Sequence, residues 1–322
     1  MTKLQFLEKA KKELFEIEQA IEEHLSAHVP LAKEVSQYIL RSGGKRLRPL
    51  LFVLSARLCG HCNGQEIQLS PIFEYIHVAS LLHDDVIDKA KLRRGRASAN
   101  IVWGNTIPIL AGDFLLSTAL SLATSSGNLK IVSVLSEATK HLSQGEILEI
   151  VETENLDLTE EGYLEIVAGK TAALMAAACR LGAILACAPE ESEEALERYG
   201  YHIGLAFQII DDVLDYVGRK EVFGKPVGQD LKEGKNTLPL IYTLRNCSQK
   251  ERQEIADLFK KRTKKDNSEI IKKVKAYGGL NYARNKAKEF IDIGERALSL
   301  FPEGPNKKCL QEAAEFIIER QY

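Results

Sequence analysis

Apolar residues recur at intervals of three and four positions along almost the whole chain, which is the period of an amphipathic α-helix. Several of these segments are rich in alanine and apolar on most faces, so we expect them to be buried at the centre of the fold. Neither the alternation typical of a strand nor an Asn-Gly hairpin between β-branched runs is present, so the pattern predicts an all-α protein. The predicted helices cover residues 4–25, 31–40, 47–58, 67–86, 100–123, 131–151, 163–188 and 195–217, and shorter ones cover 238–244, 251–259, 268–276, 281–300 and 309–320.

The interruptions between these segments are short and carry glycine, serine or proline, as at Ser42-Gly43-Gly44. The polar run 260–268 is predicted to be a solvated loop. No long linker divides the 322 residues. We therefore expect a single all-helical domain over residues 1–322.

The composition is that of a soluble globular protein, with 45% hydrophobic residues, 27% charged residues and a net charge of −2. This charge offers no broad basic surface, so nucleic acid is not an expected partner. Residues 1–20 are charged and lack the apolar core of a signal peptide. The most apolar stretch, 172–188, is interrupted by Arg180 and is expected to be a buried helix rather than a transmembrane segment. We therefore expect a cytoplasmic protein.

Six cysteines in such a chain indicate reduced thiols rather than a disulfide framework. Cys59 and Cys62 have the spacing of a redox-active dithiol, but no strand–helix–strand pattern surrounds them. We interpret this segment as a loop that ends a helix, and a redox role for the two thiols stays open.

Two acidic segments share the pattern Asp-Asp-x-x-Asp, and each follows an apolar helical segment. They consist of Asp84, Asp85 and Asp88, and of Asp211, Asp212 and Asp215. On a helix, positions i, i+1 and i+4 fall within roughly 100° of one face. Carboxylates that close repel one another, and Mg²⁺ commonly binds carboxylates together with substrate phosphates. One such motif could be a solvated acidic face, but two copies favour a metal site.

Cationic residues accompany the acidic motifs. The segment Gly44-Lys45-Arg46-Leu47-Arg48-Pro49 leads into a helix, a position at which a phosphate can bind. Further cations follow the two acidic motifs, namely Arg93 and Arg94 after the first and Lys225 and Lys235 after the second. Each cluster alone could be solvated surface. Together, two acidic and three basic clusters indicate a site for two diphosphates and several metal ions.

These motifs resemble those of the trans-isoprenyl diphosphate synthases, also called polyprenyl synthetases. The matching segments are residues 44–49, 83–94, 169–171, 207–212 and 224–240. The resemblance implies an all-α bundle of the isoprenoid synthase type I around a deep central cavity. It also implies a homodimeric, Mg²⁺-dependent prenyltransferase that condenses isopentenyl diphosphate head-to-tail onto an allylic diphosphate such as farnesyl diphosphate.

The resemblance further assigns a role to individual residues. The six aspartates of the two motifs would hold Mg²⁺, three ions per active site. Isopentenyl diphosphate would be bound by Gly44, Lys45, Arg48, His77 and Arg94. The allylic diphosphate would be bound by Arg93, Lys170, Lys225 and Lys235, with Thr171 and Gln208 beside the developing carbocation.

In short-chain members of this family, bulky aromatic side chains four or five positions before the first acidic motif close the tunnel that receives the growing chain. Ala79 and Ser80 occupy these positions and are small. We therefore expect a long, octaprenyl product for a quinone side chain, with peripheral membrane contact when it is released. Close helix packing is an alternative reason for their small size.

Three other functions stay open: a shorter-chain farnesyl or geranylgeranyl diphosphate synthase, a terpene cyclase, and a non-catalytic subunit of a heteromeric prenyl synthase. A cyclase is expected to carry an Asn/Ser/Glu-type second metal motif and to lack the loop with Lys45 and Arg48. A non-catalytic subunit is expected to have lost acidic ligands, whereas this chain keeps all six.

Overall fold

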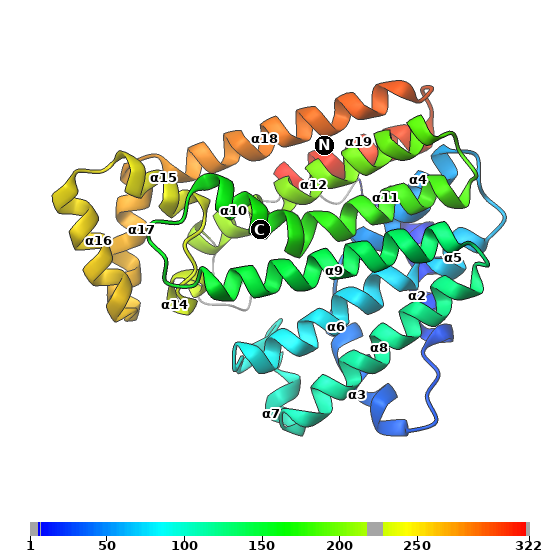
Figure 1. The fold of residues 1–322 in the computed structure, drawn as a ribbon, viewed down its shortest axis with the longest axis horizontal. Helices are drawn as coiled ribbons and strands as arrows, with labels where there is room; N and C mark the ends of the chain where they lie inside the picture. The colour runs from blue at the N-terminus through cyan, green and yellow to red at the C-terminus, as the bar shows by residue number, and fades with distance from the viewer. Residues whose placement is uncertain (1–5, 7, 218–227, 320–322) are drawn as a thin grey trace.

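The computed structural model describes residue 6 and residues 8–217 and 228–319, and it is helical almost throughout (Figure 1). The all-α prediction is confirmed. Helices in the first half are α2 (Lys11–His24), α3 (Pro30–Leu40), α4 (Leu47–Leu58), α5 (Gln65–Leu69), α6 (Pro71–Ile87), α7 (Ala99–Trp103), α8 (Thr106–Ser125) and α9 (Leu129–Val151). They are followed by α10 (Glu160–Val167), the π-helix η1 (Ala168–Ala172), α11 (Ala173–Leu185), α12 (Glu190–Val217), α14 (Gln229–Glu233), α15 (Leu238–Asn246), α16 (Gln249–Lys261), α17 (Lys264–Ala276), α18 (Gly279–Ala297), the 3₁₀ turn η2 (Leu298–Leu300) and α19 (Pro305–Ile318).

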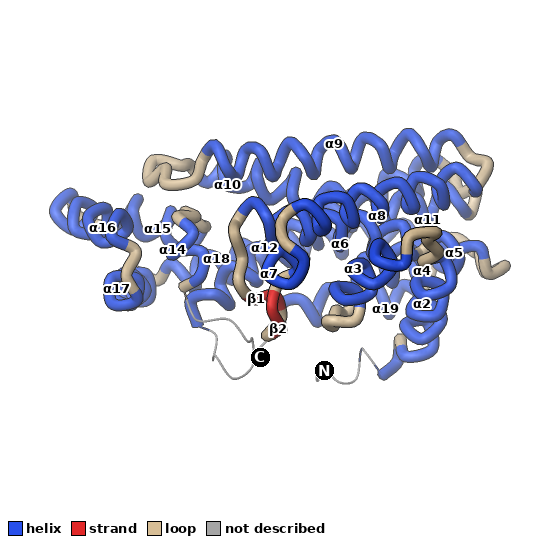
Figure 2. Tube along the Cα trace, turned by 90° about the horizontal axis from the view of Figure 1, so that it is seen from below, coloured by secondary structure: helices blue, strands red, loops and turns tan. Residues whose placement is uncertain are grey.

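The long helices α9, α11, α12 and α18 run alongside one another, and α12 packs against both α11 and α18 (Figures 1 and 2). Helix α6 packs against α8, and α11 packs against α4. The C-terminal ends of α6, α9 and α12 gather at the end of the bundle from which α16 and α17 project (Figure 1). Both acidic motifs therefore lie at one end of the molecule.

A short antiparallel pair of strands, β1 (Leu92–Arg93) and β2 (Arg96–Ala97), follows α6, although the sequence pattern predicts no strand. Arg94 and Gly95 form the turn with φ values of 51° and 79°, in the left-handed region. Strands of two residues are too short to produce the alternation from which a strand is predicted. The turn leads the chain back toward α6, where Arg93 of β1 contacts Asp85.

The prediction of a solvated loop over 260–268 is wrong except at Arg262 and Thr263, because α16 continues to Lys261 and α17 begins at Lys264. A capping box starts this helix: the Thr263 hydroxyl accepts a hydrogen bond from the Asp266 backbone N–H, and the Asp266 carboxylate accepts one from the Thr263 backbone N–H. The dense charge of the segment conceals the helical period. The predicted helix over 100–123 is divided near Gly104 into α7 and α8. Helix α4 ends at Leu58, as predicted, with Cys59 as its C-cap.

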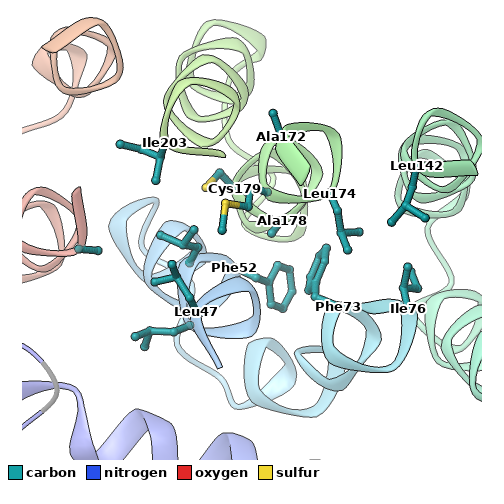
Figure 3. Close-up of a cluster of buried hydrophobic side chains, with 14 of the residues drawn as sticks. Leu47, Phe52, Phe73, Ile76, Leu142, Ala172, Leu174, Ala178, Cys179 and Ile203 are labelled. Atoms are coloured by element: carbon teal, nitrogen blue, oxygen red, sulfur yellow. The ribbon is translucent and has the colours of Figure 1, made fainter. Parts of the chain in front are cut away.

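The core between α4, α6 and α11 is filled by aromatic and aliphatic side chains (Figure 3). The rings of Phe52 and Phe73 have centroids 5.2 Å apart, and both side chains are buried. Helix α11 crosses α4 at Gly182, where an added Cβ would lie 2.7 Å from the carbonyl oxygen of Phe52. A glycine is therefore required for this close approach. A second, smaller cluster lies beneath α14–α17 and contains Tyr216, Leu231, Leu240, Ile255, Phe259, Ile270 and Val274.

Two helical segments, Thr106–Ser125 and Glu160–Leu185, are long and apolar enough to span a membrane by length and composition alone. In the second, 72% of the most apolar window is buried inside the protein, which is the property of a core helix. In the first, which is α8, only 39% is buried. Helix α8 thus presents an apolar face that the rest of the described chain leaves uncovered.

Candidate active site

The first acidic motif lies at the C-terminal end of α6, where its three carboxylates have different surroundings. Asp84 is half-buried, and Asp88 is the exposed C-cap of the helix. Asp85 is fully buried, with its Oδ1 2.8 Å from Nε and 2.7 Å from Nη2 of Arg93. Asp85 therefore holds Arg93 in place, which separates its role from those of Asp84 and Asp88.

The second acidic motif lies at the C-terminal end of α12. Asp212 is buried, and its two oxygens accept hydrogen bonds from the hydroxyl of Tyr163 at 2.6 Å and from the amide of Gln208 at 2.8 Å. Burial raises the pKa of Asp212 to about 7, although both donors oppose the rise. Asp215 accepts hydrogen bonds from two backbone N–H groups of α14, each at 3.1 Å, and so joins α14 to α12.

Two lysines lie between the acidic motifs and share one carboxylate. Nζ of Lys170 lies 2.7 Å from Glu146 and 2.8 Å from Glu149, and Nζ of Lys235 lies 3.2 Å from Glu149. Burial alone would lower the lysine pKa values, but the carboxylates outweigh it and raise both. Burial raises the pKa of Glu146 to about 7, while the two lysines more than offset burial at Glu149 and lower its pKa. Both lysines therefore stay charged.

A close crossing of two backbones places these groups together. An added Cβ on Gly145 of α9 would lie 2.5 Å from the backbone nitrogen of Lys170, and one on Gly169 would lie 2.9 Å from Cα of Gly145. Lys170 itself sits in η1, and such π-turns inside α-helices are frequent at functional sites. Glu146 and Glu149 are not among the residues predicted from the sequence. The signal was present as a glycine followed by two acids, one turn apart, within an otherwise apolar segment.

A basic cluster joins α4, α6 and the β1–β2 turn. Nε of Arg48 and Nη1 of Arg94 are buried, and neither makes a hydrogen bond within the described part of the chain. Burial, together with the positive charges of Arg48 and Arg94, lowers the pKa of His77 far below its usual range, so this imidazole is neutral. Burial lowers the pKa of Arg48, and the charges of Glu74 and then Asp211 partly offset this effect, so the cluster lies within electrostatic reach of the second acidic motif. Buried donors without partners are the donor set that an anionic ligand satisfies.

Arg46 differs from its neighbour Arg48, although both lie in the same basic segment. Its guanidinium is buried against Glu18 at 2.7 Å, Glu74 at 2.5 Å and the carbonyl of Leu40 at 2.6 Å. Arg46 therefore anchors the loop and does not bind a ligand. An added Cβ on Gly44 would lie 2.9 Å from Nη1 of Arg46, so glycine permits the loop to approach this anchor.

The remaining predicted residues have the following places. Nζ of Lys45 lies 4.9 Å from the ring centroid of Phe316 in α19, a cation–π contact. Thr171 is buried and donates a hydrogen bond to Gln208 at 2.8 Å. Ala79 is fully buried, and Ser80 is half-buried one turn before Asp84. Lys225 lies outside the described residues.

Lys170 and Lys235 also act electrostatically on the first acidic motif. Burial raises the pKa of Asp84 and of Asp88, and the positive charge that opposes the rise most is Lys170 for Asp84 and Lys235 for Asp88. A cavity of about 100 Å³ opens beside them, lined in part by Glu149, Lys170, Gln208, Asp212, Asp230 and Lys235. Three helix C-termini with their negative dipole ends also meet here. This end of the bundle therefore attracts cations.

The donor set fits Mg²⁺. Within the described residues, no three His, Cys, Asp or Glu side chains are close enough to chelate an ion by themselves. Mg²⁺ does not need such a cage, because it is usually held by one or two carboxylates, water and substrate phosphates. Separate carboxylates on α6 and α12, with lysines that can hold phosphate between them, match this mode of binding.

Comparison with known proteins agrees with the geometry. The chain matches the polyprenyl synthetase family over residues 29–277. It is 39% identical to the octaprenyl diphosphate synthase of Escherichia coli (strain K12), over 94% of each chain. It is 37% identical to the all-trans-nonaprenyl-diphosphate synthase (geranyl-diphosphate specific) of Rhodobacter capsulatus, also over 94% of each.

Solved structures show the same fold. The polyprenyl synthase from Caulobacter crescentus CB15, complexed with calcium and isoprenyl diphosphate, superposes with a TM-score of 0.95 at 34% identity and covers 100% of this chain and 98% of its own. The decaprenyl diphosphate synthase from Rhodobacter capsulatus superposes with a TM-score of 0.92 at 35% identity, with 99% of both chains covered. The all-α isoprenoid synthase fold is thereby confirmed, and this chain belongs to the polyprenyl synthetase family of prenyltransferases.

Proposed function

We propose that this prenyltransferase makes a long-chain all-trans-polyprenyl diphosphate by adding isopentenyl diphosphate units to an allylic primer such as farnesyl diphosphate. The observation that carries the proposal is the presence of two different cationic sites beside the acidic motifs. One consists of Arg48 and Arg94 with unpartnered buried N–H groups next to neutral His77. The other consists of Lys170 and Lys235, which are held by Glu149. Two sites suit two diphosphates.

In this proposal the arginine site, with Gly44, Lys45 and His77, binds isopentenyl diphosphate. A buried donor that lacks a partner costs about 1–3 kcal/mol, more when it is charged, and a diphosphate oxygen removes this cost. Neutral His77 can donate one hydrogen bond without adding charge. The donors are therefore arranged before the substrate arrives.

The lysine site, with Arg93 and Lys225, binds the allylic diphosphate between the two acidic motifs. We assign three Mg²⁺ ions per site, with Asp84 and Asp88 on one side and Asp211 on the other as the main ligands. Asp85 and Asp212 act mainly on Arg93 and Gln208, because their oxygens already accept hydrogen bonds from protein donors. When bound, Mg²⁺ supplies positive charge that stabilises the departing diphosphate.

The reaction needs no protein nucleophile. The C–O bond of the allylic substrate breaks, the double bond of isopentenyl diphosphate attacks the carbocation, and a proton leaves to the released diphosphate. Lys170 and Lys235 stabilise the charge that develops on the leaving group, which is preorganised electrostatic catalysis. The oxygens of Thr171 and Gln208 face the cation, and apolar walls exclude the water that would quench it.

The test separates the two substrates. In Arg48→Ala we expect a rise in the apparent KM for isopentenyl diphosphate, and in Lys235→Ala a rise in that for the allylic substrate. Each substrate is titrated while the other is saturating, with Mg²⁺ in excess. Arg262→Ala, which removes a surface ion pair with Glu154, serves as the control. If both variants weaken the same substrate, the division into two sites is wrong.

We further propose a cytoplasmic homodimer that releases its product at a membrane surface. The uncovered face of α8 supports the dimer, because Ile109, Leu110 and Leu120 are 41%, 57% and 48% exposed. Exposed apolar patches of this kind mark association surfaces. In Leu110→Glu we expect a monomer by sedimentation analysis, whereas Phe15→Glu on α2, also exposed, should leave the dimer intact. A wild-type monomer at micromolar concentration would contradict this assembly.

A further inference from the structure

Tyr163 stands at the end of a chain of hydrogen bonds that leads into the active site. Its side chain is 4% exposed, and its hydroxyl lies 2.6 Å from Oδ2 of Asp212. Nε2 of Gln208 lies 2.8 Å from Oδ1 of the same carboxylate. The Thr171 hydroxyl lies 2.8 Å from Oε1 of Gln208. Four side chains from α10, η1 and α12 are thus linked in sequence.

With Asp212 ionised, the direction of every bond in this chain is set. In that form the carboxylate only accepts, so both the Tyr163 hydroxyl and the Gln208 amide donate to it. The Gln208 carbonyl must then face the other way, toward Thr171, whose hydroxyl donates to it. As a result, the Thr171 oxygen turns its lone pairs, and not its proton, away from the chain. Asp212 and Tyr163 therefore determine the direction in which the oxygen lone pairs of Thr171 and Gln208 point.

Other buried tyrosines show what an ordinary structural hydroxyl does in this fold. Tyr75 donates to the carbonyl of Ile21 and Tyr199 to the carbonyl of Leu310, both at 2.6 Å. These bonds satisfy a buried polar group and reach no acidic motif. Tyr163 instead contacts the carboxylate that orients Gln208, so its hydroxyl has a connection to the site that theirs lack.

We propose that Tyr163 is a positioning residue for the condensation, which acts through Asp212 to hold Gln208 and Thr171 with their oxygens toward the allylic carbon. The proposal rests on the function proposed above, in which these two residues face the carbocation. Without the Tyr163 hydroxyl, one carboxylate oxygen loses its donor and Asp212 can rotate. The Gln208 amide can then turn over, which presents an N–H group to a developing positive charge.

The first experiment compares Tyr163→Phe with Tyr199→Phe, because each variant removes one hydroxyl from a buried ring. In Tyr163→Phe we expect kcat to fall roughly ten- to hundredfold, the range for a hydrogen bond to a charged group. The KM values for both diphosphates should change less than about twofold. In Tyr199→Phe only the melting temperature should fall. A kcat for Tyr163→Phe no lower than that of Tyr199→Phe, or a change in KM alone, would overturn the proposal.

A second experiment tests the connection itself. Among the hydrogen bonds of the described residues, those that connect the Tyr163 and Thr171 hydroxyls run through Asp212 and Gln208. Their effects on kcat should therefore not multiply if the chain acts as a unit. We therefore expect Tyr163→Phe to cost much less in a Thr171→Val background than in wild type, and to cost its full amount in Thr171→Ser, which keeps the hydroxyl. Equal fold-changes in all backgrounds would refute the relay. The wild-type enzyme is assayed in parallel. If it condenses the two substrates but the variants show no coupling, the positioning role of Tyr163 is wrong and the proposed function stands.

Discussion

Individual carboxylates within the acidic motifs have different tasks, although the motif makes them look equivalent. Asp84 is half-buried beside other carboxylates, so its loss relieves repulsion in the folded protein. Asp85 is fully buried and is the partner of Arg93, whose side chain is only 16% exposed. Removal of one partner of a buried ion pair leaves the other charge uncompensated.

Replacement of these two neighbours should therefore affect different properties. In Asp84→Ala we expect turnover to fall by several powers of ten, at roughly 1.4 kcal/mol per power, with little change in the free energy of unfolding. In Asp85→Ala we expect a loss of about 3–5 kcal/mol in stability. Urea unfolding and steady-state kinetics of both variants measure this. Near-normal turnover of Asp84→Ala in saturating Mg²⁺ would show that the metal assignment is wrong.

Glu146 should make stability depend on pH. Burial raises its pKa to about 7 from a usual value near 4.5. Because the folded state holds the proton more tightly, the stabilisation is complete below the unfolded pKa and is lost as the pH rises through 7. We expect the metal-free protein to lose about 1–3 kcal/mol of stability from this group between pH 5 and pH 8. Glu146→Gln should reduce that loss in urea unfolding at the two pH values, and an unchanged pH profile would contradict the assignment.

At the residue scale, the sequence was enough to predict the two acidic motifs and the arginines that follow the first. Glu146 and Glu149 were missed although a local signal was present, and Tyr163 carries no such signal, because the roles of all three depend on neighbours far away in the chain. Tyr163 meets Asp212 across 49 positions, and Glu149 meets Lys235 across a longer separation still. A short sequence motif identifies ligands that lie on the same helix, but not their partners on other helices. A redox role of Cys59 and Cys62, which the sequence leaves open, is disfavoured because burial raises the pKa of Cys59 to about 11 and so opposes a reactive thiolate.

Among the elements, the crossing of α9 with η1 determines how the lysines are presented. Gly145 and Gly169 meet backbone to backbone, and this contact places Lys170 between two glutamates of α9. A side chain at the crossing would push the helices apart and move Lys170 relative to the acidic motifs.

Gly145→Ala should consequently weaken allylic substrate binding, since its Cβ would meet the rigid backbone of Lys170. We expect a rise of at least about tenfold in the apparent KM for the allylic substrate, equivalent to roughly 1.4 kcal/mol, and a lower melting temperature. Gly162→Ala on α10 is the matched control, because its Cβ would meet side-chain atoms of Leu158 and Thr159 and no backbone. If both variants behave alike, the crossing does not position the site.

The long helices were predicted well because apolar residues at helical spacing form the face that each helix buries. The elements that the pattern missed have little apolar content of their own: α17 begins in a highly charged segment, and both α14 and the β1–β2 turn are too short to carry a period. For α17, the Thr263–Asp266 capping signature was the available signal. The π-turn at η1 has no recognised signal, because it arises from the packing of Gly169 against α9.

For the whole molecule, we expect the length of the product to follow from the depth of the space below the motifs. Ala79 and Ser80 are small, and Ile76, one turn before Ser80 on α6, belongs to the same buried cluster as Leu142 of α9 (Figure 3). Each helical turn is ~5.4 Å long, comparable to one extended isoprene unit. We therefore expect the side chains that close the bottom of the product tunnel, its floor, to lie at or below the level of Ile76 and Leu142.

A bulky side chain above that floor should shorten the product. In Ala79→Phe and in Ser80→Phe we expect fifteen- or twenty-carbon products. The new ring would block the tunnel about one helical turn below Asp84 and leave room only for a chain of that length. Leu81→Phe on the same helix is the control, since this position points about 100° away from Ser80. Chromatography of the dephosphorylated products measures the change. Unaltered products in both variants would mean that the chain runs elsewhere and that the small residues serve helix packing.

The most direct test of the account is the product of the wild-type enzyme. Purified protein is incubated with farnesyl diphosphate, labelled isopentenyl diphosphate and Mg²⁺, and the dephosphorylated chains are separated by length. We expect a long all-trans chain of octaprenyl length, and no condensation when a chelator removes the metal. Absence of any condensed product, or conversion of the allylic substrate alone into a hydrocarbon, would contradict the account.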